Sequence, residues 1–212
     1  MKVTIVLFFI LFLHSFAGIK GQAQDKKTIL FFGDSITAGY GIDIEDAFPA
    51  RIGARLDSLD LPYRSVNAGL SGETSAGGLR RVDWVLRQEV DIFVLELGGN
   101  DGLRGIDPEA TKENLQGIID RVSERYPQAS LLLAGMQAPP NMGESYTRRF
   151  QQIFTELAEE NGVYFMPFIL EKVAGDPDLN LPDGIHPTER GHQLIADHLW
   201  VYLSPMLSVT SY

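Results

Sequence analysis

Short apolar runs alternate with longer amphipathic stretches along most of this chain, and this alternation is the feature that most restricts its fold. The apolar runs have the length of β-strands, and two of them are apolar almost throughout, as strands buried on both faces are. Strands that alternate with helices indicate a parallel sheet covered by helices on both sides. The five predicted strands are 28–32, 63–66, 91–97, 130–134 and 163–168.

Three helices are predicted from apolar residues spaced three and four apart. One begins at Asp107-Pro108, a capping residue followed by proline, and ends before Pro127. A second is closed by Asn161-Gly162, and the last starts near Pro187. Their apolar stripes are Leu115, Ile118, Ile119 and Val122; Phe150, Ile153, Phe154, Leu157 and Ala158; and Leu194, Ile195 and Leu199.

The chain has 212 residues, enough for one domain with a full core, and it contains no internal repeat or linker. We therefore expect a single domain over residues 24–212. Acidic residues outnumber basic residues by 28 to 18, which makes nucleic acid and anionic membrane surfaces poor partners. The sequence has no cysteine, so it is not a thiol enzyme, a zinc–thiolate protein or an iron–sulfur protein.

Residues 1–23 have the pattern of a signal peptide. Lys2 precedes an apolar run over 3–13, and Gly21-Gln22-Ala23 offers a small-x-small cleavage site before Gln24. The apolar run is short for a membrane span, so a cleaved signal is favoured over a permanent anchor. The sequence therefore predicts an exported protein, with the periplasm as the expected location and full secretion as the alternative.

The segment GDSITAGYG, from Gly33 to Gly41, follows the first predicted strand. In parallel sheets, ligands bind beyond the carboxyl ends of the strands, so Ser35 lies where a nucleophile is useful. A serine hydroxyl needs a base, and His186 is a loop histidine three residues after Asp183. These two residues form a base and its orienting carboxylate in one interpretation, and a cap for the last helix in the other.

Cleavage of an ester also requires hydrogen-bond donors for the oxyanion that develops. Three candidates follow predicted strands: the backbone N–H of Ser35, the backbone of Gly72 and the side-chain amide of Asn100. Taken singly, each is more simply a turn residue. Together with Asp183 and His186, they occupy the loops after four strands at one edge of the predicted sheet, and this coincidence favours a hydrolytic site.

Four sequence blocks occur in order along the chain: Gly33-Asp34-Ser35, a glycine block that ends in Gly72, Gly98-Gly99-Asn100-Asp101, and Asp183-Gly184-Ile185-His186. With these blocks the chain resembles an SGNH (GDSL-type) hydrolase, over nearly all of residues 28–203. The segments 33–39, 97–105 and 136–150 are similar to the bacterial branch that comprises thioesterase I, lysophospholipase L1 and arylesterase.

The resemblance implies a three-layer α/β/α fold whose five-stranded parallel sheet has the flavodoxin-like strand order 2-1-3-4-5. It implies that Ser35 is the nucleophile, His186 the general base and Asp183 its orienting partner, with Ser35, Gly72 and Asn100 forming the oxyanion hole. It implies no metal and no organic cofactor, a small-molecule or lipid ester as substrate, and no obligate protein partner. The block around Ser35 is not Gly-x-Ser-x-Gly, so the nucleophile elbow of the α/β-hydrolase fold is absent.

Met142 and Tyr146 lie in the segment that resembles the thioesterase branch, and we predict that they line an apolar acyl groove, with an ordinary connecting loop as the alternative. An apolar groove favours an esterase for lysophospholipid, fatty-acyl or aryl esters, with activity on thioesters also expected. A carbohydrate acetylesterase of the same fold is the main alternative. A flavodoxin-like binding or signalling module is disfavoured, because Gly39-Tyr40-Gly41 is not a nucleotide-binding motif and the third strand does not end in a phosphorylatable Asp.

Overall fold

The computed structural model describes residues 26–207, in which five strands form a single sheet. Their order across the sheet is β2-β1-β3-β4-β5, which confirms the predicted flavodoxin-like order. The strands are β1 (Lys27–Gly33), β2 (Tyr63–Gly69), β3 (Ile92–Glu96), β4 (Ser130–Ala134) and β5 (Tyr164–Met166). All neighbouring strands pair in parallel, so their carboxyl ends lie at one edge of the sheet.

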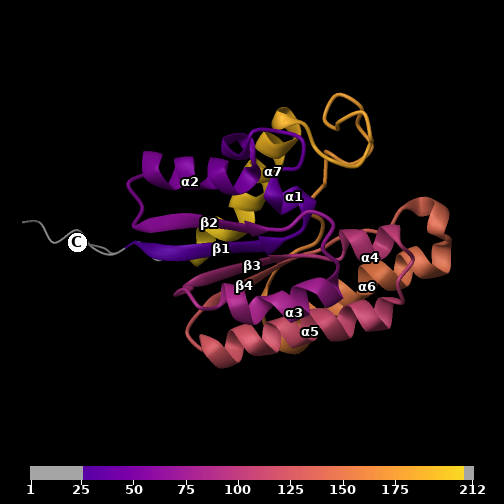
Figure 1. The fold of residues 1–212 in the computed structure, drawn as a ribbon, viewed down its shortest axis with the longest axis horizontal. Helices are drawn as coiled ribbons and strands as arrows, with labels where there is room; N and C mark the ends of the chain where they lie inside the picture. Colours follow the sequence, from indigo (N-terminus) through magenta and orange to yellow (C-terminus); the bar gives the residue numbers. More distant parts are fainter. Residues whose placement is uncertain (1–25, 208–212) are drawn as a thin grey trace, which may run out of the picture.

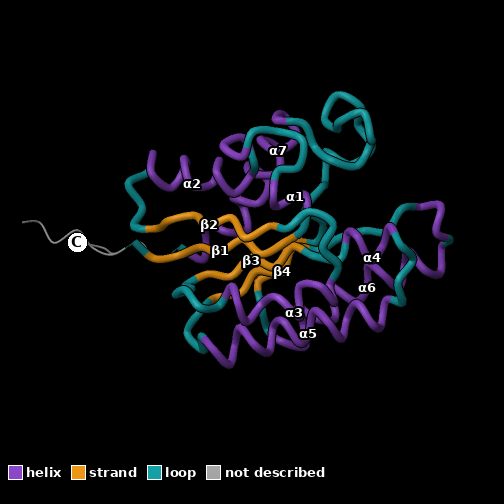
Figure 2. The backbone as a smooth tube through the Cα atoms, in the orientation of Figure 1, coloured by secondary structure: helices purple, strands orange, loops and turns teal. Residues whose placement is uncertain are grey.

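Helices cover both faces of the sheet and complete the predicted three layers. Figure 1 shows one layer above the strands and a second layer below them, and Figure 2 shows the strands enclosed between the two. The first layer contains α1 (Ser35–Ala38), α2 (Phe48–Ser58) and α7 (Glu189–Leu203). The second contains α3 (Ser75–Val85), α4 (Gly99–Leu103), α5 (Pro108–Arg125) and α6 (Glu144–Asn161). Three short 3-10 helices span Ile44–Asp46, Pro140–Met142 and Ser204–Met206.

The three predicted helices are α5, α6 and α7, and their ends follow the expected capping chemistry. The Asp107 side chain accepts the Glu109 N–H at 3.0 Å, with Pro108 as the first helical residue of α5. Gly162 closes α6 in the left-handed conformation, at a φ of 62°. The start of α7 lies slightly later than predicted, because Thr188 rather than Pro187 caps it by accepting the Gly191 N–H.

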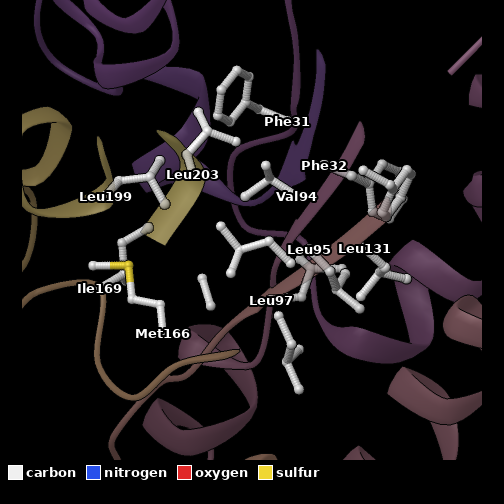
Figure 3. Packing of buried hydrophobic residues seen from close by; sticks show 14 of the residues in the cluster. Phe31, Phe32, Val94, Leu95, Leu97, Leu131, Met166, Ile169, Leu199 and Leu203 are labelled. Carbon is white, nitrogen blue, oxygen red and sulfur yellow. The ribbon is translucent and has the colours of Figure 1, made fainter. Parts of the chain in front are cut away.

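The central strands are buried on both faces, because successive side chains point to opposite helix layers. In β1, the Phe31 ring packs edge-on against Phe48 of α2, with centroids 5.7 Å apart. The next residue, Phe32, packs beside Gly78 of α3, where an added Cβ would lie 3.2 Å from its ring. Both phenylalanines are fully buried, and Figure 3 shows them in the core cluster. Burial on both faces explains why this run of sequence is continuously apolar.

The strands β1, β2 and β3 end at the same level, because Gly33 pairs with Gly69 of β2 and with Glu96 of β3. The segments that leave these strands therefore emerge side by side. Both β1 and β2 extend past the predicted apolar runs to these glycines, whereas β3 and β5 are shorter than predicted. Backbone pairing continues into polar residues here, so apolarity alone misplaces the strand ends.

Gly69 allows α1 to pass directly over the end of β2. A Cβ at Gly69 would lie 2.3 Å from the backbone nitrogen of Ala38 and 2.7 Å from its Cα. Backbone atoms cannot move aside as a flexible side chain does, so only glycine fits at this position. The close approach holds α1, and with it Ser35, against the rim of the sheet.

The predicted signal peptide over 1–23 lies outside the described residues and stays a prediction. Among residues 26–207, no helix is both long enough and apolar enough to span a membrane.

We expect Gly69→Ala to lower the free energy of unfolding by about 3 kcal/mol, since its Cβ would overlap the backbone of α1. Urea denaturation measures this change. Gly117→Ala in α5 is the matched control, because its Cβ would meet only the flexible end of Leu79 and alanine favours the helix by about 1 kcal/mol. Equal stabilities of the two variants would contradict the proposed role of Gly69.

Candidate active site

Ser35 is the first residue of α1, two residues after the end of β1 at Gly33. The Asp34 side chain caps this helix by accepting the Ile36 N–H at 3.0 Å, and Gly39 ends it in the left-handed conformation. The N–H groups of a first helical turn have no partner within the helix. Ser35 therefore presents both its hydroxyl and its backbone N–H at the carboxyl edge of the sheet.

The structure brings Ser35, His186 and Asp183 together although 151 residues separate the serine from the histidine. The distance from His186 Nε2 to Ser35 Oγ is 2.9 Å, and the distance from His186 Nδ1 to Asp183 Oδ2 is 2.7 Å. With the ring proton on Nδ1, His186 donates to Asp183 and its Nε2 accepts the Ser35 hydroxyl proton. This is the geometry of a nucleophile, its general base and an orienting carboxylate.

Asp183 is fixed by its own loop as well as by the imidazole. Its Oδ1 accepts the backbone N–H groups of Ile185 at 2.9 Å and His186 at 3.0 Å. The backbone N–H of His186, followed by the His186 side chain and the Ile185 N–H, lowers the pKa of Asp183 to about 2. Asp183 is therefore ionised at neutral pH, as a partner for an imidazolium must be.

The other two histidines of the described region are placed as structural residues. His192 is fully buried in α7, and its Nδ1 accepts the Phe48 N–H at 3.2 Å. Burial lowers its pKa to about 4, so this ring is neutral at physiological pH. His198 faces Glu171, with its Nε2 3.2 Å from the carboxylate. Neither residue lines the cavity beside Ser35.

The three candidate oxyanion donors come from the segments that follow β1, β2 and β3, and of these Ser35 and Asn100 line the cavity whereas Gly72 does not. The side chain of Asn100, in α4, donates one amide hydrogen to Asp34 Oδ2 at 3.1 Å, and its Oδ1 accepts from Arg104 at 3.3 Å. These contacts leave the second amide hydrogen of Asn100 for another acceptor. Gly72 has a φ of +78°, and no atom lies within 4 Å of the position of an added Cβ. Arg104 also donates to the Gly72 carbonyl at 3.2 Å, which links the two loops.

Two buried carboxyl groups lie beside the turn that carries Ser35. Glu96 ends β3 and is fully buried, and Asp34 is 2% exposed. Burial raises the pKa of Asp34 to about 6, although hydrogen bonds from Ile36 and Asn100 partly oppose that rise. Burial, and then the neighbouring Asp34 charge, raise the pKa of Glu96 well above its ordinary value. Of the two acids, Asp34 is the one in which both carboxyl oxygens accept a hydrogen bond, from Ile36 and from Asn100, and these bonds oppose the effect of burial.

A cavity of about 700 Å³ opens beside Ser35 and His186. Its size is within the usual range for sites that hold a small organic ligand. Its apolar walls come from the loops after β3, β4 and β5. They include Leu103, Met136, Met142, Phe168, Leu170 and Ile185. The cavity therefore offers apolar contact next to a polar reaction centre.

Of the two residues predicted to line an acyl groove, the structure places Met142 in the cavity wall and Tyr146 elsewhere. Tyr146 is the third residue of α6; its hydroxyl donates to the Ile106 carbonyl at 2.7 Å, and its ring stacks on Phe150. The Tyr146 side chain is half-buried and, together with Met142, lines a second cavity instead of the one beside Ser35, so its place in an acyl groove stays a prediction.

Sequence reasoning missed three residues that touch the site: Glu96, Arg104 and Tyr40. The Tyr40 ring lies 4.5 Å from the His186 ring, centroid to centroid. Glu96 could have been found, because a lone acidic residue in an otherwise apolar strand requires a special environment. The positions of Arg104 and Tyr40 depend on how separate loops pack together, for which the sequence contains no signal.

Asp101 lies next to Asn100 but points away from Ser35. Its carboxylate accepts from the backbone and hydroxyl of Ser75 and holds the start of α3 against α4. Within residues 26–207, no group of three or more histidine or acidic side chains is placed to hold a metal ion.

Residues 31–194 match the model of the GDSL-like Lipase/Acylhydrolase family. The chain is 38% identical to Esterase TesA of Pseudomonas aeruginosa over 187 residues, which cover 88% of this chain and 92% of that protein. It is 37% identical to Thioesterase 1/protease 1/lysophospholipase L1 of Escherichia coli, with 88% of each chain covered. It is 35% identical to Arylesterase of Vibrio mimicus, with 92% of each chain covered.

Solved structures of similar proteins have the same fold. The crystal structure of TesA aligns with a TM-score of 0.81 at 38% identity, covering 85% of this chain and all of that chain. The psychrotrophic esterase EstA from Pseudoalteromonas, inhibited by monoethylphosphonate, also aligns with a TM-score of 0.81, at 32% identity, covering 86% of this chain and 99% of that one.

The raised pKa of Asp34 leads us to expect that it destabilises the fold at neutral pH. Because the native state holds this proton more tightly than the unfolded chain does, the native protein loses stability as pH rises from about 4 to about 7. A shift from 3.8 to about 6 corresponds to roughly 3 kcal/mol. Asp34→Asn should lack this loss, so its stability relative to the native protein should increase over the same pH interval.

Urea denaturation at several pH values between 4 and 7 tests this expectation. Asp178→Asn is the control, because it removes an exposed carboxyl group that does not line the cavity. A stability difference between Asp34→Asn and the native protein that does not change with pH would contradict the expectation.

Proposed function

The chain belongs to the GDSL-like lipase/acylhydrolase family and is a carboxylic ester hydrolase, and we propose that it cleaves fatty-acyl esters with Ser35 as its nucleophile. The observation that carries this proposal is the hydrogen-bonded series from Ser35 through His186 to Asp183, with contacts of 2.9 and 2.7 Å, at the mouth of an apolar cavity. The Pseudoalteromonas esterase inhibited by monoethylphosphonate supports it, because phosphonates resemble the tetrahedral intermediate of acyl transfer.

In the acylation step, Ser35 Oγ attacks the ester carbonyl carbon while His186 Nε2 takes the hydroxyl proton. The negative charge that develops on the carbonyl oxygen accepts hydrogen bonds from the Ser35 N–H, the Gly72 N–H and the free amide hydrogen of Asn100. Asp183 stabilises the resulting imidazolium. The tetrahedral intermediate then expels the alcohol, which takes the proton from His186.

In the deacylation step, a water molecule replaces the alcohol. His186 removes one of its protons as the oxygen attacks the acyl carbon, and Ser35 leaves with the proton that His186 returns. The products are a carboxylic acid and the free enzyme. Among the described residues, His186 is the basic side chain within hydrogen-bond distance of Ser35 Oγ. His186 therefore serves as the base in both half-reactions.

The apolar wall of the cavity supports a medium or long acyl chain in the substrate. We propose an oxygen ester, such as a lysophospholipid or another fatty-acyl or aryl ester, as the natural substrate. Thioester cleavage is expected to accompany it, because the same attack applies to a thioester carbonyl. The predicted export signal also favours oxygen esters over acyl-CoA, which is a cytosolic compound.

Ser35→Ala should lower kcat by about a million-fold while leaving the stability unchanged, since only the nucleophilic oxygen is removed. The assay uses p-nitrophenyl esters from acetyl to palmitoyl with the protein over residues 24–212. For the native enzyme we expect kcat/KM to rise by up to about fourfold per methylene until the cavity is filled. Substantial activity of Ser35→Ala would contradict the proposed mechanism, and cleavage of acetyl esters alone would favour a carbohydrate acetylesterase.

Asn100→Ala should lower kcat by a factor of about 100 to 1,000 with little change in KM, because the lost hydrogen bond is made mainly in the transition state. Asn161→Ala is the matched control, since Asn161 ends α6 and its side chain bonds to Gln116 and Leu157, away from the cavity. Equal kcat values for the two variants would remove Asn100 from the oxyanion hole.

A further inference from the structure

Glu96 is a fully buried acid that the reaction steps above do not use. It occupies the last position of β3, next to the end of β1, where Gly33 is its paired residue. Every other residue of β3 is apolar, so its carboxyl group lies among core side chains. Burying an unpaired charge in such surroundings is strongly unfavourable, and a protein retains it only where other contacts compensate.

Both side-chain hydrogen bonds of Glu96 come from the turn that carries Ser35. Its Oε2 accepts the Thr37 hydroxyl at 2.6 Å and the Asp34 N–H at 3.4 Å. These two donors stand on either side of Ser35 in the sequence. A Cβ on Gly33 would lie 2.5 Å from the same oxygen, so the glycine leaves the space that the carboxyl group fills.

The two oxygens of Glu96 have different surroundings. Oε2 has its donors, whereas Oε1 is buried and has no hydrogen-bond partner in the described part of the chain. A proton on Oε1 removes the charge from the oxygen that nothing stabilises and leaves Oε2 as a neutral acceptor. Burial and the nearby Asp34 charge raise the pKa of Glu96, which agrees with this arrangement.

The neighbouring Asp34 has the opposite requirement. Its two oxygens accept from the Ile36 N–H and from the amide of Asn100, and both contacts need acceptor oxygens. His186 also favours the charged form of Asp34, whereas Asp101 opposes it. A second charge on Glu96 would compete with Asp34 for the same buried space, so the pair holds one charge on Asp34.

We propose that Glu96 is a positioning residue for Ser35, acting in its protonated, uncharged form as a fixed acceptor beneath the turn that carries the nucleophile. It holds α1 at Asp34 and Thr37, and α1 in turn sets where the Ser35 hydroxyl and backbone N–H point. The inference rests on the proposed role of Ser35. Because Glu96 does not line the cavity, its effect should appear in kcat and not in substrate binding.

Two substitutions of Glu96 test whether the neutral hydrogen-bond acceptor, and not the acidic group as such, is what matters. Glu96→Gln keeps a neutral acceptor of the same shape, and we expect kcat to stay within about threefold of the native value. Glu96→Met fills the same space without an acceptor, and we expect kcat to fall by about tenfold to a hundredfold with KM almost unchanged. Because Glu96→Met leaves the buried Thr37 hydroxyl and the Asp34 N–H without their acceptor, we expect its melting temperature to fall, and kcat is measured well below that temperature.

Thr37→Val tests the same contact from the other side, and it keeps the proposal testable if Glu96→Met does not fold. It removes the hydroxyl that Glu96 holds while preserving the branched shape, so kcat should fall with KM unchanged. In the double variant, the loss should be smaller than the product of the two separate losses, because both substitutions break one contact.

A native-like kcat for Glu96→Met or Thr37→Val would overturn the proposal. Loss of activity in Glu96→Gln equal to that in Glu96→Met would also overturn it, because the neutral acceptor would then not be the working form. Ser35→Ala, measured in parallel, distinguishes failure of the proposed function. If that variant remains active, Ser35 is not the nucleophile, whatever the Glu96 variants show.

Discussion

The parallel pairing of β1 with β2 and β3 is the constraint on which the rest of the site depends. Gly33 stands between Gly69 and Glu96 at one level of the sheet, so three chain segments leave the sheet side by side. They bring Ser35, Gly72 and Asn100 to one edge. A shift of one residue in either pairing would turn every following side chain to the opposite face of the sheet. The backbone hydrogen bonds of the sheet therefore fix the relative positions of the residues at the site.

His186, the proposed base, reaches this edge from far along the sequence, on a loop with its own hydrogen bonds. The Leu181 N–H donates to the His186 carbonyl at 2.7 Å, and the Gly184 N–H donates to the Leu181 carbonyl at 2.8 Å. The Asn180 side chain donates to the Val173 carbonyl at 2.6 Å. These contacts turn a long connection into a defined shape before α7 begins. Asp183 and His186 are thus pre-positioned as a unit, and α7 anchors that unit to the sheet.

The buried acids show how stability is given up for function at the site. Burial disfavours the charged forms of both Asp34 and Glu96, as the raised pKa of each shows. Asp34 nevertheless holds both the first turn of α1 and the amide of Asn100. One carboxylate thereby connects the turn that carries Ser35 with Asn100, which lies 66 residues after Asp34 in the sequence. The large apolar core around β1 and β3 offsets the loss of stability that burying Asp34 causes.

Local patterns in the sequence were sufficient for the fold class, the five strands, the helices α5, α6 and α7, and the residues that gather at the sheet edge. Hydrophobic periodicity and capping residues act over a few positions, so they can be recognised without a structure. The four blocks that contain Ser35, Gly72, Asn100 and His186 fall at strand ends, and the parallel topology then places them together. Strand ends at Gly33 and Gly69 escaped prediction, because backbone pairing continues where apolarity stops.

Only the tertiary structure decided which side chains meet. The packing of α6 placed Tyr146 outside the cavity beside Ser35 and left Met142 in the wall of that cavity. The packing of separate loops placed Arg104 between Gly72 and Asn100. The packing of the end of β3 against the start of α1 buried Glu96 next to the turn that carries Ser35. Such contacts join residues tens of positions apart and depend on angles between elements, whereas the sequence by itself determines the elements and the edge at which their chemistry is collected.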